Sequence, residues 1–253
     1  MWTGSIGFGL VNIPVKMYSA VEDSSLDLDM LDKKDHAHIR FKRVNEETGK
    51  EVPWQQIVKG YKMEDKYVVL EKSDFEKAAP EKSKHIEISQ FVNETEIDST
   101  YFETPYYLEP AKTGERAYSL LRDALARSGK VGIGQFVMHN REHVCIIKAL
   151  EKVIVVNRIR FPEEIRSFED LSLPAAHSKP AELKMAMSLI DQLTGKFDPR
   201  KFKDDYTNKL LKLIHAKAKG KKIPFKAMKV VHSNTNDLMQ QLKASLGSKK
   251  KAS

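Results

Sequence analysis

The stretch VGIGQFVMHNREHVCIIKALEKVIVVNRIR, residues 131–160, decides the fold class of this 253-residue chain. Val131, Ile133 and Gln135 alternate with Gly132, Gly134 and Phe136, and two apolar runs follow over 144–150 and 153–160. Such runs are typical of half-buried strands, so we expect three strands that follow one another in the chain. The glycines within 131–134 indicate a bulge or the close approach of another backbone, as the corners of a barrel require.

The same two-residue period recurs upstream of this stretch. Apolar residues alternate with glycine or polar residues over 6–10, 26–30 and 86–89, which predicts further strands there. Many short strands separated by turn residues favour a β-barrel or a β-sandwich. The front of the chain, up to about residue 161, is therefore expected to be mainly β.

Two helices are predicted within this β-rich part. A short one is expected over 54–61, where apolar residues keep a spacing of three and four. A longer one is expected over 113–129, because Thr113 can cap it, Gly129 can end it and an apolar stripe runs between them. The apolar stripe comprises Ala117, Leu120, Leu121, Ala124 and Leu125, and the opposite face carries Arg116, Arg122, Arg127 and then Lys130.

Beyond Pro174 the apolar pattern becomes helical throughout. We expect helices over 183–193 and 202–213, and a last helix over 238–246 behind the capping residues 233–236. The chain is thus predicted to consist of a β-rich body of about 160 residues and a helical arm.

The arm also holds all of the excess positive charge. The chain has 43 Lys and Arg against 35 Asp and Glu, but residues 179–253 alone have 18 against 6. No acidic residue occurs from 206 to 236, where eight lysines do. Such a run indicates contact with a polyanion, and the alternative is a solvated helix face with a solubilising tail.

The N-terminal residues and the single cysteine indicate in which cellular compartment the protein is expected. Residues 1–15 are uncharged, yet three glycines and Pro14 interrupt them and no basic n-region precedes them, so neither a signal peptide nor a membrane span is expected. Cys145 alone can form no internal disulfide and no cysteine-based zinc site. The cytoplasm is therefore the expected location.

No set of residues with the spacing of a catalytic site is found. Gly4, Gly7 and Gly9 open no helix, so they do not form a dinucleotide loop. His139 and His143 flank a polar turn, which we favour over a zinc site. Cys145 lies in an apolar run typical of a buried thiol. We therefore expect a binding protein rather than an enzyme, with no cofactor and no metal.

Longer strings of the sequence resemble the bacterial Ku family. The opening Trp2-x-Gly4-x-Ile6-x-Phe8-Gly9-Leu10-Val11-x-Ile13-Pro14-Val15-Lys16-x-Tyr18 is unusually specific, and the resemblance extends over about nine-tenths of the chain. Further matching strings, in order, are Ile57-Val58-Lys59-Gly60-Tyr61, Tyr67-Val68-Val69-Leu70, Pro105-Tyr106-Tyr107-Leu108-x-Pro110, Tyr118-x-Leu120-Leu121-Arg122, Gly129-Lys130-Val131-Gly132-Ile133-Gly134, Arg158-x-Arg160-Phe161-Pro162 and Phe197-Asp198-Pro199.

The resemblance implies a mixed α/β, β-rich fold, in which a Ku-type β-barrel core carries a bridge segment and a C-terminal helical arm. The implied boundaries are 1–175 for the core with its bridge at about 22–100, 176–220 for the arm, and 221–253 for a short basic extension. The implied function is to bind ends of double-stranded DNA as a homodimeric ring, without sequence preference. Such a ring protects and bridges breaks and recruits a multifunctional ATP-dependent bacterial DNA ligase in non-homologous end joining. No catalytic step, and no contact with a membrane, is implied, and the expected place is the nucleoid.

A ring that slides along any sequence must contact phosphates, which requires Lys and Arg rather than groups that read base edges. We predict DNA contacts from the bridge, from the region around the central helix and from the basic tail. Lys16 is a further candidate, and its place in a strand is equally consistent with a structural role. The predicted DNA-binding residues are Lys16, Lys33, Lys34, Arg40, Lys42, Arg43, Arg122, Arg127, Lys130, Lys219, Lys221, Lys222, Lys226, Lys249, Lys250 and Lys251.

Two alternatives belong to other classes. A barrel that binds single strands would stack bases on exposed aromatic side chains. Tyr106 and Tyr107 are candidates, although adjacent strand residues point to opposite faces and only one of them could take part. A nuclease would need a metal-binding carboxylate set, which the sequence does not assemble.

Overall fold

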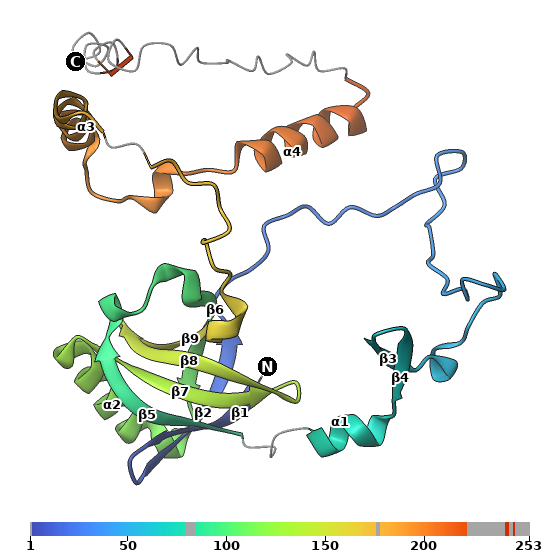
Figure 1. Ribbon diagram of the computed structural model, residues 1–253, viewed down its shortest axis with the longest axis horizontal. Coiled ribbons are helices and arrows are strands. Elements are labelled where there is room, and N and C mark those ends of the chain that lie inside the picture. The colour runs from blue at the N-terminus through green and yellow to red at the C-terminus, as the bar shows by residue number, and fades with distance from the viewer. Residues whose placement is uncertain (1, 79–83, 176–177, 222–240, 243–244, 246–253) are drawn as a thin grey trace. The chain divides into compact units, whose positions relative to one another are not determined.

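Seven strands form a closed barrel in the computed structural model of the chain (Figure 1). Around the barrel the order is β1, β2, β6, β9, β8, β7 and β5, and β5 pairs with β1 to close it. The β1–β5 pair is parallel and all the others are antiparallel. The strands are β1 (Trp2–Phe8), β2 (Val11–Ser19), β5 (His85–Asn93), β6 (Phe102–Pro110), β7 (Lys130–Met138), β8 (Arg141–Leu150) and β9 (Val153–Ile159).

The structure describes residues 2–78, 84–175, 178–221, 241–242 and 245. The chain divides into two units, Met1–Phe168 with the barrel and Glu169–Ser253 with the last helices. Among the described residues, no helix is long and apolar enough to cross a membrane. Short 3-10 turns join the longer elements of the first unit: η1 (Trp54–Gln56), η2 (Glu94–Glu96), η3 (Ser99–Tyr101), η4 (Lys112–Gly114) and η5 (Pro162–Glu164).

Helix α2 (Glu115–Ser128) packs over one end of the barrel and completes its core. Its buried face consists of Tyr118, Leu121 and Leu125, a spacing of three and four along the helix. Gly129 ends the helix with a φ of 63°, as the sequence predicted. Leu120 was predicted for the apolar stripe but is exposed, because the buried face is centred on Leu121 and Leu125 and Leu120 lies to its side.

The hydroxyl group of Tyr118 joins two strands at the point where their pairing ends. It donates a hydrogen bond to the carbonyl oxygen of Leu108 in β6 and accepts one from the N–H group of Ile154 in β9, each at 2.7 Å. Leu108 and Ile154 form the last pair of these two strands. The side chain thus satisfies two buried backbone groups and ties α2 to the barrel.

The glycines of β7 allow the close approach that the sequence predicted. A Cβ atom on Gly134 would lie 2.9 Å from the carbonyl oxygen of Glu87 in β5. The neighbouring strand β5 has a register shift between Ile88 and Gln90, opposite this part of β7. Curvature of the sheet at this corner therefore depends on a small residue in one strand and an irregularity in the other.

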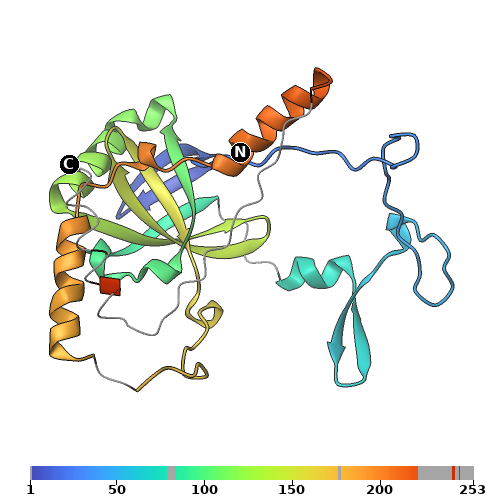
Figure 2. The ribbon, with the colours of Figure 1, turned by 90° about the horizontal axis from the view of Figure 1, so that it is seen from above.

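Residues 20–84 connect β2 to β5, and we call them the β2–β5 segment. It holds η1, a separate two-stranded sheet of β3 (Lys59–Met63) and β4 (Lys66–Leu70), and the short helix α1 (Lys72–Ala78) (Figure 2). The side chains of its described residues are mostly exposed, including many large apolar ones.

Two predictions for this segment were wrong. The helix expected over 54–61 is a single 3-10 turn followed by β3, because residues 59–63 pair with the β-branched and aromatic run 66–70 as a hairpin. The strand expected over 26–30 is irregular, because the barrel pairs β2 directly with β6 and leaves it no partner. Two isolated bridges follow it, between Leu31 and His38 and between Val44 and Glu51.

Up to residue 221, the described part of the second unit contains the helices α3 (Pro180–Leu193) and α4 (Asp205–Ala218), as the apolar period predicted. Helix α4 begins later than expected, because Pro199–Lys201 forms the 3-10 turn η6 and the side chain of Asp204 caps the helix by accepting from Thr207 N–H. The predicted last helix over 238–246 lies almost wholly outside the described residues.

Candidate nucleic-acid interface

Two tight turns position the cations at the start of the β2–β5 segment. In the first turn, the carbonyl oxygen of Asp32 accepts from His36 N–H and its side chain accepts from Lys34 N–H, each at 2.8 Å. This hydrogen bonding places Lys33 and Lys34 within the turn itself. Both side chains are exposed.

The second turn follows a few residues later. The side-chain oxygen of Asn45 accepts from the N–H groups of Glu47 at 3.0 Å and Thr48 at 2.9 Å, and Gly49 has a φ of 65°. Between the two turns lie the remaining predicted contacts of this segment, Arg40, Lys42 and Arg43. Residues 33–43 thus contain five cations and a single acid, Asp35.

The five cations differ in how far neighbouring groups already engage them. Lys42 Nζ donates to Glu51 Oε2 at 2.6 Å, which raises the pKa of Lys42, and the guanidinium of Arg43 lies 4.6 Å from the ring centroid of Trp54. The side chains of Lys33, Lys34 and Arg40 have no ion pair or hydrogen bond within the part of the chain that the structure describes. These three are therefore available to a ligand.

The barrel cations predicted to bind DNA do not form one group. Lys16 is exposed on β2, where Glu109 of β6 is its cross-strand neighbour. Arg127 is exposed in the last turn of α2, and Lys130 is half-buried at the start of β7. Lys130 contributes, after the hydrogen bonds from Asn93, to the lowered pKa of Glu96.

Arg122 is the most constrained of them. Its Nε and Nη2 donate to Asp123 Oδ1 at 2.9 and 2.8 Å, and its Nη1 donates to the carbonyl oxygen of Lys152 at 3.4 Å. Its side chain is 27% exposed. The guanidinium is thus held in one place beside the β8–β9 turn and is already paired with a carboxylate.

Other arginines of the barrel have structural partners. Arg158 Nε donates to Glu103 Oε2 at 2.5 Å, and Arg160 Nη1 donates to the carbonyl oxygens of Thr100 and Phe102, each at 2.8 Å. Lys148 forms an ion pair with Glu94. These contacts tie β8 and the end of β9 to the β5–β6 connection and to the start of β6. These cations therefore stabilise the barrel and are not free to bind a ligand.

The predicted lysines of the C-terminal unit are only partly described. Lys219 follows the last turn of α4, and Lys221 lies just beyond it, both exposed. Lys222, Lys226, Lys249, Lys250 and Lys251 lie outside the described residues.

The histidine and cysteine positions agree with the predicted turn and buried thiol. His139 and Asn140 have φ values of 54° and 62° and form the turn between β7 and β8. His143 packs on Phe136, and burial lowers its pKa. Burial raises the pKa of Cys145 to about 12, so this thiol is a poor nucleophile at neutral pH. Among the described residues, no group of three or more potential metal ligands occurs.

Two groups of exposed residues were not predicted from the sequence as parts of a binding surface. Lys59, Lys62 and Lys66 lie on the β3–β4 hairpin, part of which the apolar spacing assigns to a helix. Tyr18 of β2 lies directly opposite Tyr107 of β6, and both are exposed. The sequence places Tyr107 only beside its chain neighbour Tyr106, because nothing in the local sequence shows which strands pair.

Comparison with known proteins gives a consistent match over nearly the whole chain. The family model of the Ku70/Ku80 beta-barrel domain matches residues 7–185. A "Non-homologous end joining protein Ku" of Coxiella burnetii (strain RSA 331 / Henzerling II) is 39% identical over 260 residues, which cover 99% of this chain and 95% of that protein. A protein of the same name from Bacillus subtilis (strain 168) is 38% identical, over 97% of this chain and 81% of that protein. With its closed β-barrel and these relatives, the chain belongs to the Ku family.

Proposed function

We propose that this protein binds the ends of double-stranded DNA without sequence preference, as a ring-shaped homodimer. In this role it protects and bridges double-strand breaks and recruits an ATP-dependent DNA ligase for non-homologous end joining. It performs no catalytic step of its own. The relatives that carry the name of this pathway support the proposal, because they align with almost all of the chain.

The observation that carries the proposal is the group of free cations in the β2–β5 segment. Lys33, Lys34 and Arg40 are exposed and unpaired among the described residues, in a segment that joins two strands of a packed barrel. Lysine and arginine bind the DNA backbone through its phosphates, irrespective of base sequence. A segment of this kind suits a protein that must accept DNA ends of any base sequence.

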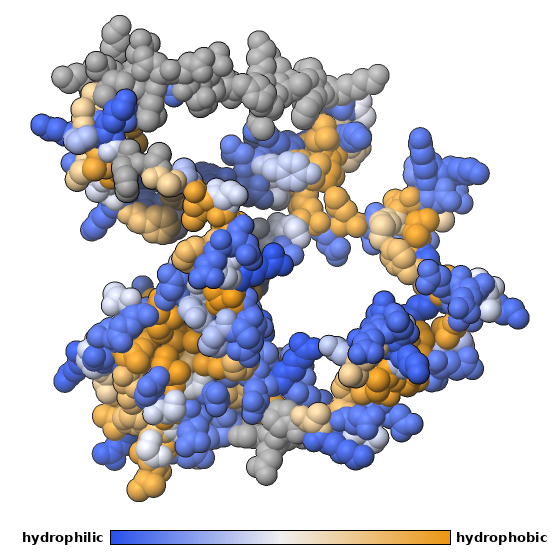
Figure 3. Space-filling view, in the orientation of Figure 1, coloured by the Kyte–Doolittle hydropathy of each residue, from blue (hydrophilic) through white to orange (hydrophobic). Residues whose placement is uncertain are grey.

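The apolar surface of the same segment supports a dimer. Tyr61, Met63, Tyr67, Val68 and Val69 of the β3–β4 hairpin are all exposed, and Figure 3 shows apolar side chains gathered on the hairpin surface. An isolated two-stranded sheet is marginally stable in water. A second copy of the chain would bury these side chains and stabilise the hairpin, which a closed ring requires.

The test compares linear and covalently closed circular duplexes of the same sequence. We expect strong binding to the linear form only, by a particle of twice 28.9 kDa in light scattering. Affinity should fall by roughly 10³ to 10⁵ between 50 and 200 mM salt if six to ten phosphates are contacted. Equal binding to both topologies would contradict end threading and leave a general DNA-binding protein.

Recruitment of a ligase is tested separately. An ATP-dependent bacterial DNA ligase should join linear fragments faster when this protein is present, and should be retained on the DNA with it. A protein that binds ends but does not change the rate or retention of the ligase would refute recruitment while leaving end binding intact.

A further inference from the structure

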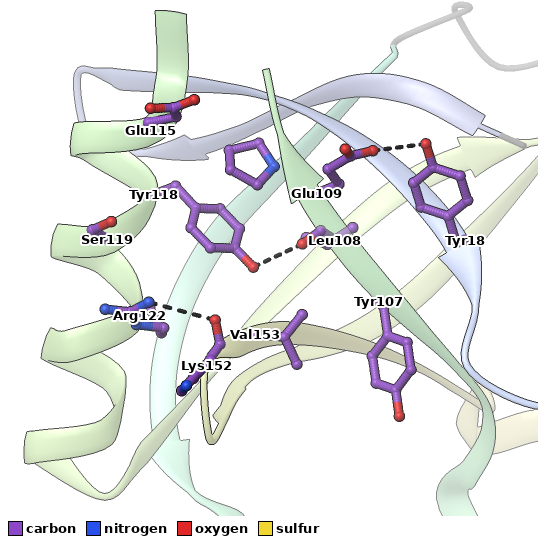
Figure 4. A pocket seen from close by; sticks show the side chains of 11 residues that line it. Tyr18, Tyr107, Leu108, Glu109, Glu115, Tyr118, Ser119, Arg122, Lys152 and Val153 are labelled. Atoms are coloured by element: carbon purple, nitrogen blue, oxygen red, sulfur yellow. Dashed lines mark hydrogen bonds between the residues drawn. The ribbon is translucent and has the colours of Figure 1, made fainter. Parts of the chain in front are cut away.

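A pocket of about 550 Å³ lies on the barrel surface beside helix α2 (Figure 4). Leu108, Pro110 and Val153 form an apolar base, while α2 contributes Ser119 and Arg122 on one side. Tyr18 and Tyr107 line the opposite side, from strands β2 and β6. The volume falls in the range of sites that take a small molecule or a single residue of a polymer.

The two tyrosines form a pair of exposed rings on a rigid support. Tyr18 and Tyr107 are direct cross-strand neighbours, with exposed fractions of 39% and 41%. Tyr18 is held by a hydrogen bond of 2.7 Å from its hydroxyl group to Glu109 Oε2. The pocket wall behind them is tied to α2 through the buried hydroxyl group of Tyr118. Aromatic rings exposed in this way are suitable for stacking against a flat guest.

Polar groups around the pocket match the edge and the phosphate of a nucleotide. Arg122 is fixed at the mouth by Asp123 and by the carbonyl oxygen of Lys152, and Lys152 itself lines the same side. Glu109 can accept hydrogen bonds from the amino groups of a base, and Ser119 can donate or accept. Lys152 has no ion pair among the described residues, so its ammonium group is available to a phosphate. Arg122 is already paired with Asp123, and Glu109 and Glu115 also line the pocket.

We propose that this pocket takes an unpaired nucleotide from the single-stranded overhang of a DNA end. The base stacks on Tyr107 and Tyr18, and the adjoining phosphate contacts Lys152. The inference deepens the proposed function, on which it rests, by making ends with overhangs the preferred substrate over blunt ends. A peptide of a protein partner is the competing occupant. The exposed rings favour the nucleotide, because every base has a flat face that can stack on them, and Lys152 provides a positive charge for the backbone.

The experiment measures the affinity for a blunt duplex and for the same duplex with a five-nucleotide overhang of either polarity. The wild-type protein should bind at least one overhang more tightly than the blunt end. Tyr107→Leu should abolish this preference, by about tenfold in affinity, and leave blunt-end affinity unchanged, whereas Tyr107→Phe should retain it. Phe91→Leu is the matched control, because Phe91 is 43% exposed on β5 and does not line the pocket.

A second readout uses 2-aminopurine in the overhang, whose fluorescence falls when the base stacks. Quenching by the wild-type protein and by Tyr107→Phe, but not by Tyr107→Leu, is expected. Equal quenching by all variants, or loss of the preference in Phe91→Leu as well, would overturn the inference. So would a Tyr107→Leu variant that keeps the overhang preference but no longer retains the ligase, since the occupant would then be a peptide.

The two proposals can fail separately. If the wild-type protein bound closed circles as well as linear duplexes, end threading would be refuted, and quenching of a single-stranded 2-aminopurine oligonucleotide would still decide whether the pocket binds a base. If end threading held and no quenching occurred, the pocket inference alone would be refuted.

Discussion

The barrel and the β2–β5 segment use the same residue types in opposite ways. In the barrel, apolar side chains of seven strands and α2 are packed into one core, and arginines such as Arg158 and Arg160 have partners within the barrel. In the segment, large apolar side chains are exposed and Lys33, Lys34 and Arg40 are unpaired among the described residues. The barrel is thus stabilised by its own contacts, whereas the segment has side chains that only a partner can engage.

This difference shows why net charge alone is a weak guide to the DNA-binding surface. The segment as a whole holds slightly more acids than bases, yet residues 33–43 concentrate five cations against one acid. What matters for binding is whether a cation is already neutralised by a neighbour, because a paired cation must give up its partner before it binds a phosphate. The following predictions test that distinction, from the largest expected effect to the smallest.

Removing apolar volume should destabilise the barrel far more than the segment. Leu121→Ala, at a residue 1% exposed in the core, should lower the free energy of unfolding by about 2–5 kcal/mol. Val68→Ala, at an exposed position of the hairpin, should change it by less than about 0.5 kcal/mol and weaken the dimer instead. Urea unfolding measures the first effect, and light scattering at several concentrations measures the second. Equal destabilisation by both substitutions would contradict the difference in packing between the barrel and the β2–β5 segment.

Neutralising the three free cations should weaken DNA binding uniformly across sequences. Combined Lys33→Gln, Lys34→Gln and Arg40→Gln should reduce the slope of log affinity against log salt by about three, because each cation neutralises roughly one phosphate. The matched control is Lys72→Gln with Lys179→Gln and Arg200→Gln, because each of those cations already has an acidic partner. Titration of a fluorescent linear duplex at several salt concentrations gives both slopes. A similar reduction of the slope in the control variant would refute the assignment of these three cations to DNA binding.

Deleting one hydroxyl group should loosen the packing of α2 on the barrel. Tyr118→Phe leaves the carbonyl oxygen of Leu108 and the N–H group of Ile154 without their shared partner, at a cost of about 1–3 kcal/mol. Urea unfolding of the variant beside Tyr106→Phe, which lacks this bridging role, measures the difference. Unchanged stability would mean that the two strands close up and pair directly.

Releasing a paired cation should have the smallest effect of the four, and it should raise duplex affinity rather than lower it. Glu51→Gln removes the acidic partner of Lys42, which is 2.6 Å away, and leaves the lysine free to bind a phosphate. Because the pair is exposed, its removal should hardly change stability, and duplex affinity should rise by less than about tenfold. The same titration measures the gain, and Glu76→Gln, which releases Lys72, is the control. A fall in affinity would show that the pair positions Lys42 for binding.

The local elements that the sequence predicted well are those whose partners lie nearby in the chain. The strands over 144–150 and 153–160, the end of α2 at Gly129, and the helices α3 and α4 follow from period, capping and glycine alone. The wrong predictions, at 26–30 and 54–61, fall in the β2–β5 segment. An alternating run there forms no strand, because β-pairing needs a partner strand as well as a pattern.

The sequence by itself determined the β-rich class, the helical arm, the family resemblance and the cations available for a polyanion. Only the tertiary structure decided which of those cations are free, that Tyr18 lies opposite Tyr107, and that α2 adds a pocket beside them. The physical reason is that period and capping are local properties of the chain. Ion pairs and cross-strand neighbours, such as Arg158 with Glu103, join residues distant in sequence, and only the closure of the barrel brings them together.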